Sequence, residues 1–327
     1  MQVTVLSGGI GGARFLLGLR ALGHDITVVG NTGDDLSLLG LRICPDLDTV
    51  MYTLGGGISA ERGWGREDET FRVRSELTAY AEGLPNGDAD SPIPSWFGLG
   101  DLDLATHLLR SEWLRAGMPL SQVTDRLCRR WRPGVRLLPV TNTPIETHVD
   151  LLDGRRVHFQ QWWVELRASV AATGFDVVGV GAATPAPGVI DSIRDADVIL
   201  LPPSNPVVSV GVILAVPGVA DALRCTHAPV VGLSPIVGDA PVRGMADACL
   251  SAIGVPTTAA AVALHYGARS RGGLIDGWLV DLVDESSVSS LRSAGLRAAA
   301  VPLMMTDLAA TEAMARAALD LASGESE

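Results

Sequence analysis

Short apolar runs rich in β-branched residues alternate along most of the chain with apolar stretches of helical length. The runs predict strands at 3–6, 26–29, 135–140, 176–181, 198–201, 229–233, 274–280 and 299–304. The longer stretches predict helices at 15–22, 187–194, 242–253, 257–266 and 307–321. Strand–helix alternation over this length is typical of a doubly wound, mostly parallel sheet. We therefore predict an α/β fold.

The pattern changes between residues 61 and 133, which contain more Arg, Trp and Glu and no clear strand. Apolar residues recur there at helical spacing over 104–116, which includes Leu108, Leu109 and Trp113, and again over 120–131. This predicts a helical insertion at 61–133 in a core formed by 1–60 and 134–322. Residues 157–166 fit a strand or a helix equally well.

A glycine cluster, Gly8-Gly9-Ile10-Gly11-Gly12, follows the first predicted strand. Glycines at a strand-to-helix turn allow close backbone approach, and the helix N-terminus behind them favours phosphate. The dinucleotide fingerprint is broken, because Arg14 stands where its third glycine belongs. A P-loop is excluded, because it requires a lysine and all 25 basic residues are arginines.

Four aspartates follow the second predicted strand, two in Gly30–Asp35 and two in Cys44–Thr49. In an open α/β sheet such loops meet at the carboxyl ends of the strands. Carboxylates beside a phosphate site imply an intervening cation, and one or two carboxylates plus substrate phosphates commonly hold Mg²⁺. Asp34 and Asp35 are explained equally well as turn residues. The spaced pair Asp46 and Asp48 is the stronger metal candidate.

Two later loops also follow predicted strands. The first, 202–209, offers Ser204 and Asn205 as hydrogen-bonding groups, with Ser209 placed to cap a helix running to Ala215. The second, 234–244, carries Arg243. A proline-fixed turn with an ordinary cap explains the first loop too, but three loops at strand ends favour one anion site.

Two further segments carry candidate chemistry. Trp96 and Phe97, beside glycines, either line a pocket for a flat ring or anchor a loop in the core. Glu146 and His148 fit an acid–base pair or an exposed turn.

Composition limits the function classes. The net charge of −12 over 327 residues argues against non-specific binding to nucleic acid or to anionic membranes. No leader-like segment or spanning apolar run is seen, so we expect a cytoplasmic protein. The four cysteines are scattered without a C-x-x-C pair, which disfavours zinc and a disulfide framework.

Taken together, the motifs resemble one family. They are Gly8–Gly12, Asn31–Asp35, Cys44–Thr49, Gly100–His107, Ser204–Ser209 and Arg243–Asp247. In order and spacing they resemble the 2-phospho-L-lactate transferase family, in particular its actinobacterial phosphoenolpyruvate transferase branch.

The resemblance implies a Rossmann-like core with a helical subdomain, commonly as a homodimer. It also implies transfer of a phosphoenolpyruvyl or 2-phospholactyl group from a guanosine diphosphate conjugate to a deazaflavin, with Mg²⁺ and release of GMP, in coenzyme F-420 biosynthesis. The expected catalytic and metal-binding residues are Asp46 and Asp48. Expected deazaflavin-binding residues are Asp48, Thr49, Trp96, Phe97, Gly100 and Asp101. Expected nucleotide-binding residues are Gly8, Gly9, Gly11, Gly12, Asn31, Ser204, Asn205, Ser209 and Arg243.

Two positions depart from the family pattern. Leu102 stands where a basic residue is usual, and Ala240 where a lysine is common. Both changes reduce positive charge near the expected phosphates. The alternatives are a non-catalytic regulator that binds a nucleotide-sugar through the same core and, more weakly, a nicotinamide-dependent oxidoreductase.

Overall fold

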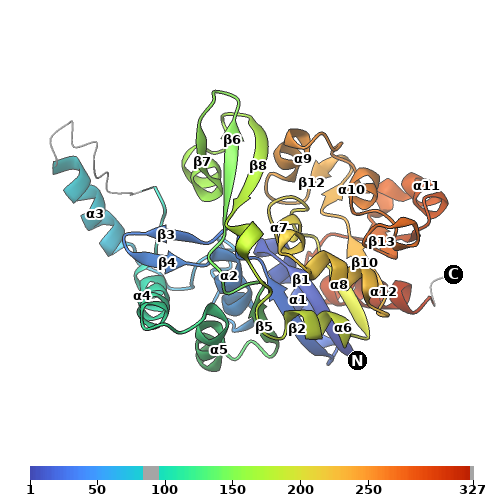
Figure 1. Cartoon of the computed structure of the whole chain (residues 1–327), viewed down its shortest axis with the longest axis horizontal. Helices are drawn as coiled ribbons and strands as arrows, with labels where there is room; N and C mark the ends of the chain where they lie inside the picture. Colours follow the sequence, from blue (N-terminus) through green and yellow to red (C-terminus); the bar gives the residue numbers. More distant parts are fainter. Residues whose placement is uncertain (84–95, 325–327) are drawn as a thin grey trace.

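A seven-stranded parallel sheet forms the centre of the computed structural model, which describes residues 1–83 and 96–324 (Figure 1). The strand order is β14-β13-β10-β9-β1-β2-β5. The strands are β1 (Gln2–Ser7), β2 (Asp25–Gly30), β5 (Arg136–Pro139), β9 (Val198–Leu201), β10 (Val230–Leu233), β13 (Gly277–Val280) and β14 (Arg297–Ala300). All neighbouring strands pair in parallel, which confirms the predicted α/β class.

The order of the strands reverses at β1. The chain passes from β1 to β2 on one side, and later returns to pair β9 with the other side of β1. In open α/β sheets, ligands bind outside the carboxyl ends of the strands at such a switch point. The topology therefore directs attention to the loops that follow β1, β2 and β9.

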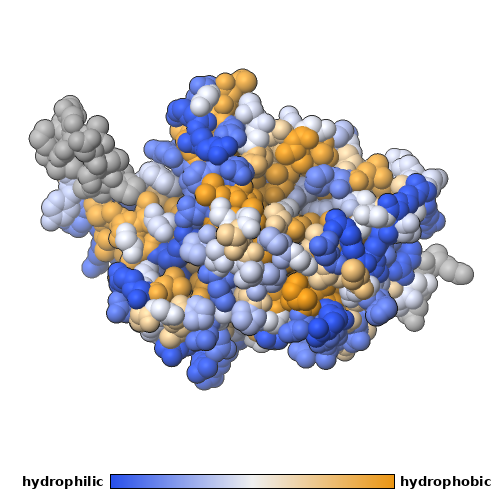
Figure 2. All heavy atoms as spheres, in the orientation of Figure 1, coloured by the Kyte–Doolittle hydropathy of each residue, from blue (hydrophilic) through white to orange (hydrophobic). Residues whose placement is uncertain are grey.

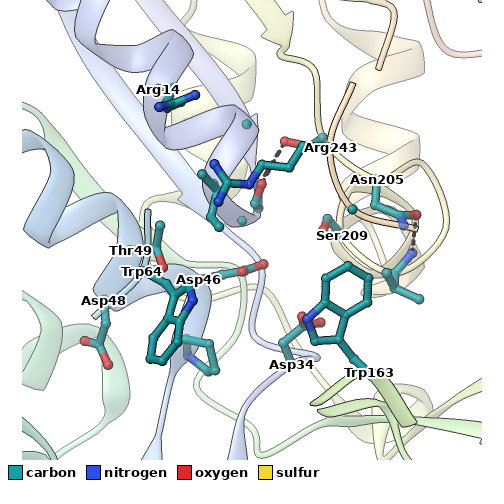
Figure 3. Close-up of a pocket in the computed structure, with 18 of the residues that line it drawn as sticks. Arg14, Asp34, Asp46, Asp48, Thr49, Trp64, Trp163, Asn205, Ser209 and Arg243 are labelled. Carbon is teal, nitrogen blue, oxygen red and sulfur yellow. Dashed lines mark hydrogen bonds between the residues drawn. The ribbon is translucent and has the colours of Figure 1, made fainter. Parts of the chain in front are cut away.

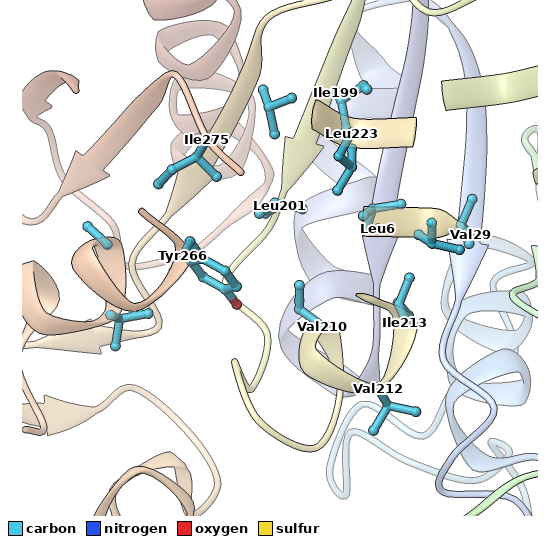
Figure 4. Close-up of a cluster of buried hydrophobic side chains, with 14 of the residues drawn as sticks. Leu6, Val29, Ile199, Leu201, Val210, Val212, Ile213, Leu223, Tyr266 and Ile275 are labelled. Atoms are coloured by element: carbon cyan, nitrogen blue, oxygen red, sulfur yellow. The ribbon is translucent and has the colours of Figure 1, made fainter. Parts of the chain in front are cut away.

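Helices cover both faces of the sheet, and each face buries its own apolar cluster. On one face pack α1 (Gly9–Ala21), α2 (Pro45–Leu54), α5 (Leu120–Trp131) and α12 (Leu308–Ser323). On the other pack α6 (Val189–Arg194), α7 (Val210–Ala215), α8 (Val219–Cys225), α9 (Ala246–Ala252), α10 (Ala259–Tyr266) and α11 (Val288–Ser293). Figure 4 shows the second cluster, where Leu6, Val29 and Leu201 of the sheet lie near Ile213 and Leu223 of the helices.

Two helices predicted for the core begin several residues away from the expected position. We predicted the first helix at 15–22, but α1 starts at Gly9, so the glycine cluster forms its first turn. The predicted helix at 242–253 is preceded by a short β-pair, β11 (Ile236–Val237) with β12 (Ala240–Pro241), and α9 begins only at Ala246.

The helices between 61 and 133 are α3 (Arg72–Gly83), α4 (Asp101–Arg115) and α5, while residues 84–95 lie outside the described part. Helices α3 and α4 cap each other. The Glu69 carboxylate accepts hydrogen bonds from the Leu102 and Asp103 N–H groups at 2.8 and 2.7 Å, and Asp101 accepts from Arg72 and Val73. This reciprocal capping sets the start of α4 at 101 instead of the predicted 104.

A small antiparallel sheet, β7-β6-β8, was not predicted. It contains β6 (Glu146–Leu151), β7 (Arg156–His158) and β8 (Ala172–Val178), and it projects from the main body in Figure 1. The run at 176–181 therefore belongs to this lobe and not to the main sheet. The ambiguous segment 157–166 contains the end of β7 and a π-helical turn, Gln161–Glu165.

A hairpin of β3 (Leu36–Leu38) and β4 (Leu41–Ile43) lies between β2 and α2, against α4. Contrary to the helical pattern, Leu108 and Leu109 of α4 are exposed, as is Leu39 in the hairpin turn. In Figure 2, apolar residues gather on the side of the molecule where this hairpin lies. No helix in the described residues is long and apolar enough to span a membrane.

Candidate active site

A cavity of about 920 Å³ opens at the carboxyl ends of β1, β2, β9 and β10, a volume suited to a substrate of cofactor size. Its walls come from the first turn of α1, the pocket-facing side of α2, the loops after β9 and β10, and the insertion. The loops that the sequence placed at strand ends therefore do meet. Figure 3 shows Asp34, Asp46, Asn205 and Arg243 around one space.

Most glycines of the Gly8–Gly12 cluster pack so closely against other parts of the chain that a Cβ would not fit. A Cβ on Gly11 would overlap the Pro203 carbonyl oxygen, and one on Gly12 would overlap the Ser7 hydroxyl. One on Gly8 would lie 2.6 Å from the Ser209 Cβ. Only Gly9 combines a positive φ (65°) with free space in front of it, and it lies beside Asp46.

Three of these glycines, Gly8, Gly9 and Gly11, line the cavity, whereas Gly12 does not. The Ser204 hydroxyl donates to the Gly8 carbonyl at 2.8 Å, which fixes the loop after β9 against the start of α1. The close packing thus brings the first turn of α1 and the 202–209 loop together, with backbone exposed to the cavity between them.

Asn31 joins three segments beneath the cavity floor. Its fully buried amide nitrogen donates to Asp34 at 3.0 Å, to Asp46 at 2.9 Å and to the Val208 carbonyl at 3.2 Å. Asn31 does not itself line the cavity, but Asp34 and Asp46 do. The carboxylates that share one donor at the cavity floor are therefore Asp34 and Asp46.

Asp48 is held differently. It lies two residues after Asp46 in α2, and residues at that spacing do not face each other on a helix. Both of its oxygens bind the guanidinium of Arg110 on α4, with Nη1 to Oδ2 at 3.0 Å and Nη2 to Oδ1. In Figure 3 it points away from Asp34 and Asp46. The predicted Asp46–Asp48 ligand pair is therefore not formed, because Arg110 already occupies Asp48.

The protonation of the Asp34–Asp46 pair reflects its surroundings. Burial raises the pKa of Asp34 well above its usual range, and the nearby Asp46 raises it further. Burial also raises the pKa of Asp46 to about 6, against hydrogen bonds from Asn31 and the Gly9 N–H. Like-charge repulsion disfavours the doubly ionised pair, and a bound cation would relieve it.

Within the described ranges 1–83 and 96–324, no group of three or more His, Cys, Asp or Glu side chains could hold a metal ion. Two carboxylates completed by substrate phosphates and water match the usual coordination of Mg²⁺. Asp34 and Asp46 therefore fit this ion, whereas Asp48 does not.

The loop after β9 is shaped from within. The Asn205 side-chain oxygen accepts from the Val207 and Val208 N–H groups at 2.9 and 3.2 Å. Ser209 takes the N-cap position of α7, but its side chain makes no capping hydrogen bond. Ser204, Asn205 and Ser209 all line the cavity.

Two arginines border the same space. Arg243, from the loop after β10, lines the cavity and donates to the Arg62 carbonyl at 3.0 Å. Arg14, one turn into α1, lines it as well. Both place positive charge at the border of the cavity, which suits an anion.

The expected acceptor residues separate into two groups. Asp48, Thr49 and Phe97 line the cavity. Trp96 instead packs with Leu36, Leu38, Ile43 and Leu99 beneath the hairpin. Gly100 is the N-cap of α4, and Asp101 caps α3, so neither lines the cavity. The interpretation of Trp96 as a core anchor is therefore the one the structure supports.

Several cavity residues were not among the predicted site residues. They are Arg14, Asp34, Tyr52, Trp64, Asp103, His107, Gln160, Trp163, Met304 and Thr306. Trp64 stands between two glycines, and Trp163 follows another tryptophan. These sequence contexts could have indicated aromatic residues in the cavity wall. Glu146 and His148 lie on β6 outside the cavity, where Glu146 pairs with Arg42 at 2.6 Å.

The sheet, its switch point and the cavity above it define a Rossmann-like α/β protein with a substrate-sized site at the strand ends. Comparison with known proteins narrows this class. The family profile described as "2-phospho-L-lactate transferase CofD" matches residues 3–318. The chain belongs to this family and is a transferase.

Curated relatives align over nearly their whole length. Proteins named phosphoenolpyruvate transferase are 62% identical in Streptomyces coelicolor, 57% in Thermobifida fusca and 54% in a Mycobacterium species. Each alignment covers 98% of this chain and 98–99% of the relative. Among solved structures, protein BH3568 from Bacillus halodurans aligns with a TM-score of 0.61 at 18% identity, over 97% of this chain and 99% of that one. This second likeness concerns the fold alone.

Proposed function

We propose that the protein transfers a phosphoenolpyruvyl or 2-phospholactyl group from a guanosine diphosphate conjugate to the terminal hydroxyl of a deazaflavin, releasing GMP, in coenzyme F-420 biosynthesis. The relatives at 54–62% identity, named phosphoenolpyruvate transferase, favour the enolpyruvyl donor. The observation that carries the proposal is the composition of the cavity. One end offers backbone and arginines for phosphates, the other offers aromatic walls, and an acidic pair lies on the floor.

The nucleotide end of the cavity is assigned to Gly8, Gly9, Gly11, Ser204, Asn205, Ser209 and Arg243. Arg14 adds a second positive charge to this group. Trp163 lies across from Asn205 in Figure 3 and offers a flat surface for the guanine. Gly12 and Asn31 act indirectly, by packing the glycine turn and by holding Asp34 and Asp46.

Magnesium is assigned to Asp34 and Asp46. When bound, it would neutralise the diphosphate and the charge that develops on the leaving phosphate. The residues of the chain would contribute by positioning the donor and the acceptor hydroxyl, which is the main requirement of phosphoryl transfer. Asp46 and Gly9 lie together at the start of α2 and α1, so the donor phosphates would meet the acidic pair there.

The acceptor is assigned to the opposite end of the cavity, bordered by Thr49, Tyr52, Trp64 and Phe97. Thr49 and Tyr52 lie about one helical turn apart on the cavity face of α2, and Trp64 lines the same cavity. A planar ring with a hydroxylated tail suits these walls.

A regulator that binds a nucleotide-sugar is the second candidate, supported only by fold-level likeness. Titration of the protein with free deazaflavin, followed by its fluorescence, separates the two. Saturable binding that a Trp64→Ala substitution weakens supports the transferase. Absence of deazaflavin binding alongside tight GDP binding would favour the regulator.

We also expect a cytoplasmic homodimer. The exposed apolar side chains Leu39, Leu102, Leu108 and Leu109 on the β3–β4 hairpin and α4 support self-association. Light scattering at several protein concentrations measures the mass directly, and Leu108→Glu with Leu109→Glu should shift it toward the monomer.

A further inference from the structure

Phosphoryl transfer to a hydroxyl group releases a proton, and the cavity offers few groups to receive it. The carboxylates that line it are Asp34, Asp46, Asp48 and Asp103, and His107 is the one imidazole among its lining residues. The inference below rests on the proposed function and concerns which of these groups receives the proton.

Three of the carboxylates are already engaged. Asp34 and Asp46 both accept hydrogen bonds from the Asn31 amide, Asp34 accepts another from Gln160, and the pair is assigned to the cation. Both oxygens of Asp48 bind the guanidinium of Arg110, which is 1% exposed. A proton on Asp48 would leave that buried cation without its counter-charge.

His107 is excluded by its own contacts. Its Nδ1 lies 3.0 Å from Arg110 Nη1, and because a guanidinium only donates, this nitrogen must accept. The ring proton is then on Nε2, which lies 3.1 Å from Asp103 Oδ2. With Nδ1 occupied and Nε2 protonated, the neutral ring has no free lone pair for a substrate proton.

Asp103 remains, and its surroundings hold it in place as a carboxylate. The Tyr52 hydroxyl donates to Oδ1 at 2.6 Å, and His107 lies against Oδ2. Burial acts to raise the pKa of Asp103, but the neighbouring His107 ring and the hydrogen bond from Tyr52 outweigh it and hold the pKa below its usual value. The side chain keeps 14% of its surface exposed, toward the cavity it lines.

The position of Asp103 also suits the acceptor. Asp46, Thr49 and Tyr52 follow one another at three-residue intervals along the cavity face of α2. Side chains on a helix lean toward its N-terminus, so Tyr52 carries its hydroxyl, and with it Asp103, back toward Thr49 and the acidic pair. Asp103 thus borders the space between the acceptor end and the phosphates.

We propose that Asp103 is the catalytic proton acceptor, positioned by Tyr52 and by a His107–Arg110–Asp48 chain behind it. The deazaflavin hydroxyl oxygen forms a bond to the phosphorus that carries the three-carbon acid. The bond from that phosphorus to the bridging oxygen breaks, and the oxygen leaves with both electrons as part of GMP. The hydroxyl proton passes to a carboxylate oxygen of Asp103. A weakly basic aspartate is adequate, because protein kinases use one for the same step.

The test compares Asp103→Asn, Asp103→Ala and a control, Glu112→Gln, in which an exposed acid of the same helix is neutralised. Asn keeps the acceptor for Tyr52 but is not basic. The expected kcat of Asp103→Asn is about 10²-fold below wild type, with the KM for deazaflavin within about threefold. Formate should raise the rate of Asp103→Ala at least about tenfold, whereas chloride at the same concentration should not. A purely structural defect would not respond to an added carboxylate.

Two results would overturn the inference: a kcat for Asp103→Asn within about tenfold of wild type, or equal rates for Asp103→Ala in formate and chloride. If the wild type itself forms no deazaflavin product, the proposed function fails, and the inference falls with it. If the wild type forms the product and the kcat of Asp103→Asn stays within about tenfold of it, only the inference fails.

Discussion

Gly11 gives the sharpest prediction about the glycine segment, because the structure assigns it a packing role. A Cβ at this position would overlap the backbone carbonyl oxygen of Pro203, in the loop after β9. A backbone oxygen cannot rotate aside as a side chain can, so either α1 or the loop must shift. Overpacking of this kind costs about 1–3 kcal/mol. For a chain of this length we expect Gly11→Ala to lower the melting temperature by roughly 2–6 °C.

The matched control is Gly181→Ala, where a Cβ would meet nothing within 4 Å. Scanning calorimetry of the ligand-free proteins should show the control within about 0.5 kcal/mol of wild type. If Gly11→Ala melts with the control while its affinity for GDP falls, the glycine makes room for a ligand and the packing argument is wrong.

Three further predictions follow from the buried charges. Asp46→Asn should abolish Mg²⁺-dependent turnover in a folded protein, and a normal Mg²⁺ titration of its activity would contradict the cation site. The pKa values of Asp34 and Asp46 are raised in the folded state, so the folded chain binds more protons than the unfolded chain. The free energy of unfolding of the ligand-free protein should therefore fall as the pH rises from about 4 to about 7, and it should fall less steeply in Asp46→Asn. Urea unfolding across that range measures this, and an upward trend unchanged by the substitution would refute it. Arg110→Met should lower the free energy of unfolding by about 3–5 kcal/mol, because it leaves the Asp48 carboxylate buried without its counter-charge. Adding Asp48→Asn should recover part of that loss, and no recovery in the double variant would show that the two residues are not coupled.

The main sheet could be predicted from sequence because its strands are buried on both faces. Val198–Leu201 and Val230–Leu233 are fully buried, so they read as continuous apolar runs between helices. The small lobe escaped prediction because β6 has only two apolar residues, Val149 and Leu151, which are too few to form an apolar run.

The site was predictable in outline for a topological reason. Loops after parallel strands meet at one edge, so the glycine cluster, the aspartates and the 202–209 loop had to approach one another. Their local roles were not predictable. Helix α1 begins at Gly9, and Gly11 in its first turn packs against the Pro203 carbonyl, which lies far away in the sequence.

The pairing of the carboxylates was hidden for a similar reason. The spacing of Asp46 and Asp48 suggested one site, but α2 turns them apart, and the partner of Asp48 is Arg110, 62 residues later. Likewise, Asp34 could not be told from a turn residue until Asn31 was seen to join it to Asp46.

Under the proposed function, the cavity transfers a phosphorylated three-carbon acid to a deazaflavin and does not hydrolyse the guanosine diphosphate donor. The most direct measurement incubates the protein with Mg²⁺ and the enolpyruvyl or lactyl guanosine diphosphate conjugate, with and without deazaflavin, and follows GMP and the deazaflavin product by mass spectrometry. We expect GMP release that depends on deazaflavin and equals, mole for mole, the deazaflavin that carries the new phosphodiester. GMP released equally fast without deazaflavin, and no mass gain on the deazaflavin when it is present, would contradict it.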